Sequence, residues 1–179
     1  MAARPAFDAP RGIAYHAAMS SRAFSIRPVC SSDDLAATMA LFNAYAAFLG
    51  IDLSYQNFAD EMAAMPGKYA PPKGALLLAR GPDGAALGCV GLRPLDDGAC
   101  EMKRLYVTPQ GWGLGLGRAL AEAVVGEARR IGYEEMRLDT LPRLAAAIAL
   151  YQDMGFVRIP AYYDTPIAGT LFFALSLRS

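Results

Sequence analysis

The spacing of apolar positions predicts a helix over residues 31–50 near the start of the chain. Ser31 or Ser32 can cap its amino terminus, and Gly50 can end it. Between them, apolar side chains recur at spacings of three and four, which places them on one helical face: Leu35, Met39, Phe42, Tyr45 and Leu49. A second, shorter helix is predicted around residues 55–65, followed by a loop over residues 66–74.

Short apolar runs bounded by turn residues predict strands in the middle of the chain. The runs cover residues 75–80, 85–95 and 99–107, separated by the sequences GPDG and DDG. Strand, turn, strand, turn, strand is the order of an antiparallel meander. An earlier apolar run, residues 23–29, predicts a first strand that ends near Pro28.

Helical and strand-like patterns alternate after the meander. A helix is predicted at residues 116–131, a strand at 135–140, a helix that ends at Gly155 and a closing strand at 169–177. The order βααβββαβαβ predicts a single α+β domain, residues 23–179, with a mixed central sheet flanked by helices. Residues 1–22 mix Ala, Pro and Arg, and we expect them to be a loosely ordered N-terminal extension.

Composition and charge exclude several classes of partner and chemistry. Seventeen basic residues balance seventeen acidic ones, which disfavours binding to nucleic acid, and no apolar run is long enough to span a membrane. The three cysteines form no C-x-x-C pair, so they suit a reducing cytoplasm and are expected to be small core residues. His16 is the only histidine, so neither a metal centre nor catalysis by a Ser–His–Asp triad is expected.

The sequence LYVTPQGWGLGLGRAL, residues 105–120, places glycines at four alternate positions between a strand and a helix. A tight turn is one use of such glycines. A second is an anion cradle, in which bare backbone N–H groups and a helix amino terminus bind phosphate. Four glycines exceed what a turn requires, which favours the cradle. Neither the P-loop pattern nor the dinucleotide pattern G-x-G-x-x-G fits these positions.

Three segments together resemble the Gcn5-related N-acetyltransferase (GNAT) family. The phosphate loop of that family reads [Q/R]-x-x-G-x-[G/A], and Gly115-Leu116-Gly117 supplies its G-x-G. The preceding YVTP resembles the usual V-x-P, and AIALYQDMGF, residues 147–156, resembles the family's tyrosine-bearing helix followed by Gly-Phe. Two positions depart from the pattern: Trp112 stands at the Gln/Arg position, and Leu144 stands where asparagine is frequent.

The resemblance implies transfer of an acetyl group from acetyl-CoA to a primary amine of a small molecule, amino acid or peptide. It implies that the central strand separates from its neighbour and binds the pantetheine arm, while the loop binds the pyrophosphate. Arg118 either adds charge there or is a solvated side chain of the first helical turn. The implied cofactor site comprises Leu105, Tyr106, Val107, Trp112, Gly113, Gly115, Gly117 and Arg118.

The resemblance makes Tyr151 the expected general acid that protonates the leaving thiolate; the alternative is a core tyrosine. Glu101 is the first candidate for the general base, against an exposed strand carboxylate, and Asp139 is a weaker candidate. Tyr162 and Asp164, in a loop before the last strand, are candidates for the acceptor site, with aromatic packing as the alternative.

A second functional class stays open, namely a non-catalytic module that binds acyl-CoA as a sensor or scaffold. Such a module would need neither Tyr151 nor Glu101. The identity of the amine and the existence of a homodimer are not determined by the sequence.

Overall fold

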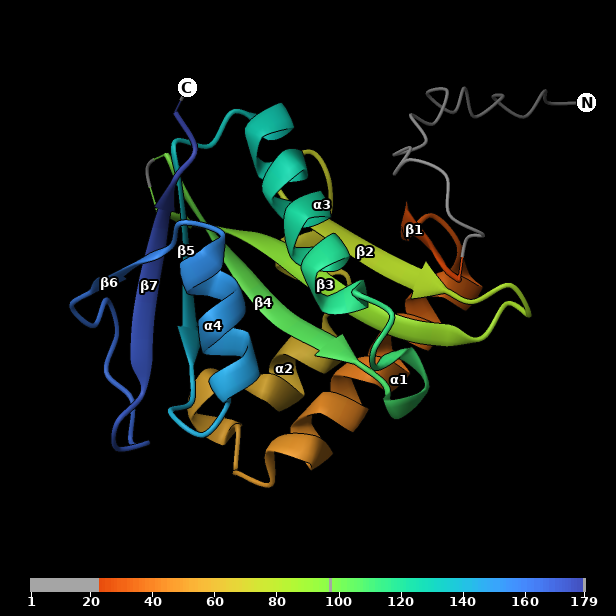
Figure 1. Ribbon diagram of the computed structural model, residues 1–179, viewed down its shortest axis with the longest axis horizontal. Coiled ribbons are helices and arrows are strands. Elements are labelled where there is room, and N and C mark those ends of the chain that lie inside the picture. The colour runs from red at the N-terminus through yellow and green to blue at the C-terminus, as the bar shows by residue number, and fades with distance from the viewer. Residues whose placement is uncertain (1–22, 97, 179) are drawn as a thin grey trace, which may run out of the picture.

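The computed structural model describes residues 23–96 and 98–178 (Figure 1). The predicted N-terminal extension, residues 1–22, lies outside the described residues, and so does His16. Seven strands form one sheet in the order β1-β2-β3-β4-β5-β7-β6. The strands are β1 (Ser25–Pro28), β2 (Ala75–Arg80), β3 (Ala86–Asp96), β4 (Ala99–Val107), β5 (Glu135–Thr140), β6 (Val157–Ile159) and β7 (Leu171–Ser176).

Helices cover both faces of this sheet, with α3 and α4 on one face and α1 and α2 on the other (Figure 1). The helices are α1 (Ser32–Leu49), α2 (Phe58–Ala63), α3 (Leu116–Ile131) and α4 (Ala145–Asp153), and short 3₁₀ turns lie at Ser54–Gln56, Gly67–Tyr69 and Pro109–Gly111. The predicted α+β class with a mixed sheet flanked by helices is therefore confirmed. Among the described residues, no helix has the length and hydrophobicity of a membrane span.

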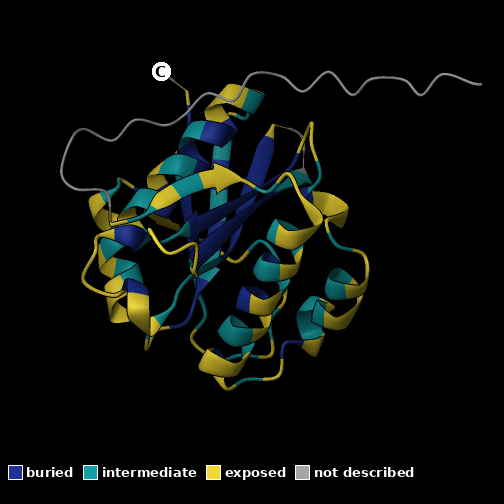
Figure 2. Cartoon of the chain, turned by 90° about the vertical axis from the view of Figure 1, so that its right-hand side faces the viewer, coloured by how far each residue is buried: buried dark blue, intermediate teal, exposed yellow. Residues whose placement is uncertain are grey.

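Alternation along the central strands divides the core into two layers, one on each face of the sheet. In β2, Leu77 packs in the cluster beneath α3, whereas Leu76 and Leu78 pack in the cluster beneath α1. Successive side chains of a strand point to opposite faces, so one apolar run supplies both layers. Figure 2 accordingly shows buried central strands between helices that are exposed on their outer sides.

The first helix begins and ends as its sequence predicts. The Ser31 side chain accepts a hydrogen bond from the backbone N–H of Asp34 at 3.1 Å, and Gly50 adopts a left-handed φ of 58° at the carboxyl end. The second helix is shorter than predicted, because Asn57 takes a left-handed φ of 54° and separates α2 from the 3₁₀ turn before it.

Two further features differ from the sequence prediction. β6 adds a strand of three residues that pairs with β7, which is too short to show a periodic pattern. The predicted loop 66–74 contains Tyr69, whose ring is buried against Gly91 and whose hydroxyl donates to Glu61 at 2.8 Å.

Of the cysteines, Cys89 and Cys100 are buried as predicted, whereas Cys30 is exposed.

The pairing of β4 with β5 is the only parallel pairing in the described sheet, and it is short. Its register runs from Ala99 opposite Glu135 to Glu101 opposite Arg137 and continues no further. Beyond these residues the two strands diverge toward their carboxyl ends (Figure 1). This is the separation of the central strand that the family resemblance implied.

A bulge in β4 lies within the diverging part of the strand. The register between β3 and β4 shifts there, and Arg104 has a left-handed φ of 58°. Its buried guanidinium forms an ion pair with Glu61 of α2 at 2.7 Å and donates to the side-chain oxygen of Gln56 at 2.8 Å. Burial alone would raise the pKa of Glu61, but the hydrogen bonds and charge of Arg104, together with the hydrogen bond from Tyr69, outweigh burial, and the pKa is lowered.

We expect Glu61→Leu to lower the free energy of unfolding by about 3 kcal/mol or more, because it leaves the Arg104 charge buried without a partner. Urea denaturation measures the change. The double variant Glu61→Leu/Arg104→Leu is the control, and it should recover part of the loss because no unpaired charge remains. A double variant less stable than the single one would show that the ion pair does not hold α2 on the bulge.

Candidate active site

A cavity of about 600 Å³ lies where β4 and β5 diverge. Every residue of β4 from Met102 to Val107 lines it, and so do residues 138–141 of β5 and the following turn. The carboxyl half of α1 and the segment after it close a second side, and α4 closes a third. Leu105, Tyr106 and Val107, three predicted cofactor residues, are therefore brought together along one wall.

The loop that leads from β4 into α3, residues 112–118, is here called the glycine loop. Gly113 and Gly115 have left-handed φ values of 77° and 72°, which favour glycine. Within the described structure, the backbone N–H groups of residues 113–118 donate to no other group. A run of unengaged N–H groups at the start of a 16-residue helix has the geometry that suits an anion.

Gly117 lacks a side chain for a different reason from its neighbours. Its φ is not left-handed, and an added Cβ would meet only Val107 Cγ2, at 3.9 Å, an ordinary van der Waals distance. The protein's own packing therefore tolerates a larger residue there. Because Gly117 lines the cavity, its missing side chain leaves room for a ligand.

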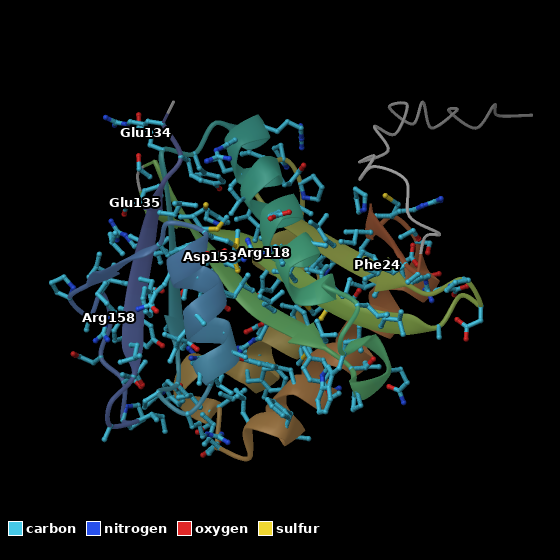
Figure 3. All side chains as sticks on the ribbon, in the orientation of Figure 1. Phe24, Arg118, Glu134, Glu135, Asp153 and Arg158 are labelled. Carbon is cyan, nitrogen blue, oxygen red and sulfur yellow. The ribbon has the colours of Figure 1, made fainter. Side chains whose placement is uncertain are left out.

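The side chains of Trp112 and Arg118, at the two ends of the glycine loop, both contact other groups of the protein. The indole of Trp112 lines the cavity, is 61% exposed and donates through Nε1 to the carbonyl of Val107 at 3.1 Å. Arg118 does not belong to the cavity lining; its guanidinium pairs with Asp153, so that the pair joins α3 to α4 (Figure 3).

Tyr151 lines the cavity from α4, and its ring packs against Phe156 and Phe173. Among the described residues no group forms a hydrogen bond with its hydroxyl. Burial raises the pKa of this hydroxyl, and the nearby Tyr45 and Asp139 raise it further. The hydroxyl is therefore protonated at neutral pH and can donate a proton to a ligand in the cavity.

Tyr45 is a cavity residue that the sequence analysis interpreted only as part of an apolar helical face. Its hydroxyl also has no hydrogen-bond partner in the described part of the chain. Burial and the charge of Asp139 raise its pKa to about 12. Nothing in its 3–4 spacing distinguishes it from Phe42 or Leu49, so the sequence carried no signal for this position.

Asp139, the weaker candidate base, is the carboxylate that lines the cavity. It accepts a hydrogen bond from Lys103 Nζ at 2.8 Å and another from the hydroxyl of Tyr163. Burial alone would raise its pKa, but the charge and hydrogen bond of Lys103 outweigh burial, so the pKa is lowered. Asp139 is therefore an anion at neutral pH.

Glu101 occupies a different position from the one expected of a general base. It is 1% exposed, it does not line the cavity, and its carboxylate pairs with Arg93 at 2.7 Å. Tyr162 donates to it at 2.7 Å. The alternative of an exposed strand carboxylate is wrong, because Glu101 is buried.

The predicted acceptor residues are not in the cavity lining either. Tyr162 packs edge-on against Tyr163 and Phe172, which corresponds to the aromatic-packing alternative, and Asp164 is exposed. The neighbouring Tyr163 is closer to the cavity, because its hydroxyl contacts the lining residue Gln56 at 3.2 Å. Within the described residues, no group of His, Cys, Asp or Glu is arranged to hold a metal ion.

Comparison with known proteins matches residues 38–156 to the acetyltransferase (GNAT) family. An uncharacterized N-acetyltransferase of Schizosaccharomyces pombe is 41% identical over 86% of this chain and 94% of its own length. A Klebsiella pneumoniae protein assigned as an acyl-CoA N-acyltransferase superposes with a TM-score of 0.69, at 29% identity over 87% of this chain and 98% of its own. The protein yncA of Salmonella typhimurium, solved with its cofactor acetyl-CoA, superposes with a TM-score of 0.63, at 24% identity over 88% of this chain and 95% of its own.

Gly117→Ala should have opposite effects on stability and on ligand binding. Alanine is the better helix former by up to about 1 kcal/mol, so the free protein should be slightly more stable. The new methyl group projects into the cavity, so affinity for coenzyme A should fall at least about tenfold, or 1.4 kcal/mol. Calorimetric titration and thermal unfolding measure the two effects.

The control is Gly126→Ala in the same helix, which should leave the affinity unchanged. Unaltered coenzyme A affinity in a folded Gly117→Ala variant would remove the glycine loop from the binding site.

Proposed function

This chain belongs to the acetyltransferase (GNAT) family and is an N-acetyltransferase; we propose that it transfers the acetyl group of acetyl-CoA to the primary amine of a small molecule, amino acid or peptide. The observation that carries this proposal is the cavity between the diverging strands β4 and β5, with the glycine loop at the end of β4. The presence of acetyl-CoA in the Salmonella structure supports the choice of cosubstrate.

The residues present fit acetyl-CoA in two respects. The unengaged N–H groups of the glycine loop suit its pyrophosphate, and the space beside Gly117 suits a chain that passes the start of α3. The unpaired edge of β4 beyond Glu101 offers backbone groups to the pantetheine amides, as an added strand would. Acetyl-CoA supplies the activated acetyl group as a thioester.

We propose that the backbone N–H of Leu105 polarises the thioester carbonyl. Leu105 lines the cavity immediately after the bulge at Arg104. A preorganised donor of this kind stabilises the oxyanion that develops in the transition state, typically by about 3 kcal/mol. The buried ion pair between Arg104 and Glu61 fixes the bulge and therefore the direction of this N–H.

Tyr151 is proposed as the acid that protonates the departing thiolate sulfur. Its support is a protonated hydroxyl in the cavity without a hydrogen-bond partner among the described residues. Asp139, rather than Glu101, is proposed to receive the acceptor amine, because it is the carboxylate in the cavity lining. The lowered pKa of Asp139 suits it to hold the amine by charge, and the amine proton passes to water.

Release of free CoA from acetyl-CoA in the presence of a panel of primary amines tests the proposed activity. Acetylated amine, identified by mass spectrometry and formed in step with free CoA, is the expected result. Binding of acetyl-CoA without release of CoA for any amine would favour the non-catalytic module instead.

Tyr151→Phe should lower kcat by roughly 100-fold or more, the usual scale of general acid catalysis, and leave the affinity for acetyl-CoA unchanged. The ring remains, so the packing against Phe156 and Phe173 is kept. The loss should shrink at high pH, because a thiol with a pKa near about 8.5 then leaves without an acid. Steady-state kinetics over a pH series measures both effects.

Tyr133→Phe is the matched control, since its hydroxyl donates to the carbonyl of Lys73 away from the cavity. Its kcat should equal that of the wild type. Wild-type turnover in Tyr151→Phe, where chemistry limits the rate, would make Tyr151 a core residue only.

A further inference from the structure

The part of the cavity that faces α1 is walled by apolar side chains. Leu49, Leu53 and Leu141 form a buried cluster there. Partly buried neighbours extend it, namely Tyr45, Ile51, Tyr55 and Leu144, and all seven residues line the cavity. These seven residues are here called the acceptor wall.

Polar groups beside the acceptor wall are engaged with one another. The amide nitrogen of Gln56 donates to the hydroxyls of Tyr55 and Tyr163, and its amide oxygen accepts from Arg104. Arg104 itself is paired with Glu61. Gln56 and Arg104 are therefore already engaged, and a polar group of the acceptor could bind to them only by displacing a hydrogen bond that is already made.

Three polar side-chain groups of the lining are candidates to bind the amine nitrogen, and all three line the same cavity. Two are the hydroxyls of Tyr45 and Tyr151, which lack hydrogen-bond partners within the described residues. The third is the carboxylate of Asp139, which accepts from Lys103 and Tyr163 and has lone pairs left for a further donor. One anion and two hydroxyls suit a single primary amine.

Further charges on an acceptor would be unfavourable in this cavity. Asp139 is the only carboxylate in its lining among the described residues, so a second ammonium group would have no anion. Of the lining cations, Lys103 and Arg104 are paired with carboxylates, and the exposed Arg143 donates to the carbonyl of Leu49. Both buried cations are therefore engaged, so that within the described lining only the exposed Arg143 could meet an acceptor carboxylate.

We propose that the acceptor is a small primary amine that carries an apolar group and no second charge. Its nitrogen lies among Asp139, Tyr45 and Tyr151, and its apolar group lies against the acceptor wall. This assignment rests on the proposed acetyl transfer and names the acceptor of that same site. Specificity then comes from the number of methylene groups that the wall removes from water.

A series of unbranched amines from ethylamine to pentylamine tests the apolar wall. Each added methylene should raise kcat/KM roughly fourfold, because burying one methylene is favourable by about 0.8 kcal/mol. Across the series this amounts to about a sixtyfold increase. A flat or falling series, measured as CoA release at saturating acetyl-CoA, would overturn the assignment.

Two charged analogues of pentylamine test the exclusion of a second charge. Cadaverine adds a second amine at the far end, and norleucine adds a carboxylate beside the first. Both should have kcat/KM values at least about tenfold below that of pentylamine. A value equal to or above that of pentylamine for either analogue would contradict the proposal.

Leu53→Ala and Leu141→Ala should lower kcat/KM more for pentylamine than for ethylamine, so that the increase per methylene becomes smaller. General damage to the enzyme would lower the values for all amines equally. The exposed Val157, outside the cavity, supplies the control Val157→Ala, which should keep the full slope. A full slope in both wall variants would overturn the proposal.

Different results would overturn the proposed acetyl transfer and the acceptor assignment. No CoA release with any amine, despite tight binding of acetyl-CoA, would overturn the proposed acetyl transfer and the acceptor assignment with it. Release that shows no preference for apolar amines would overturn the acceptor assignment alone.

Discussion

The divergence of β4 from β5 is the constraint on which the rest of the structure depends. The two strands pair through only three residues each and then separate inside the sheet. Buried backbone N–H and C=O groups need hydrogen-bond partners, so strands that part in the middle of a sheet open a polar edge toward whatever fills the gap. In this fold the gap is a cavity, and helices close it on both faces of the sheet.

The charged residues of β4 around that cavity are neutralised by ion pairs. Glu101, Lys103 and Arg104 are all buried, and each pairs with an opposite charge from a neighbouring element. Removing one partner would leave an uncompensated buried charge, which is far more costly than the pair itself is stabilising. Because the charges neutralise one another, much of the cavity wall remains apolar, and Asp139 is the carboxylate in the described lining that we propose meets the acceptor.

Short-range sequence signals predicted the helices and strands, whereas the residues that line the cavity could be identified only from the tertiary structure. The Ser31 cap, the Gly50 stop and the turns of the meander are short-range signals, and the structure follows them. Tyr45 is part of a regular helical face, so only the divergence of β4 and β5 opposite α1 makes it a cavity residue. The spacing of β4 likewise could not show that the carboxylate of Glu101 is buried and contacts Arg93 and Tyr162.

Amide hydrogen exchange tests the central claim most directly, namely that acetyl-CoA binds along the open edge of β4 and at the glycine loop. With saturating acetyl-CoA, exchange should slow for the backbone N–H groups of Leu105, Val107 and residues 113–118, because they acquire hydrogen-bond partners, whereas the N–H of Tyr106 faces β3. The N–H groups of β2, which are already paired on both sides with β1 and β3, should change little. Protection elsewhere, with unchanged exchange at Leu105, Val107 and residues 113–118 in a protein that binds acetyl-CoA, would contradict the account.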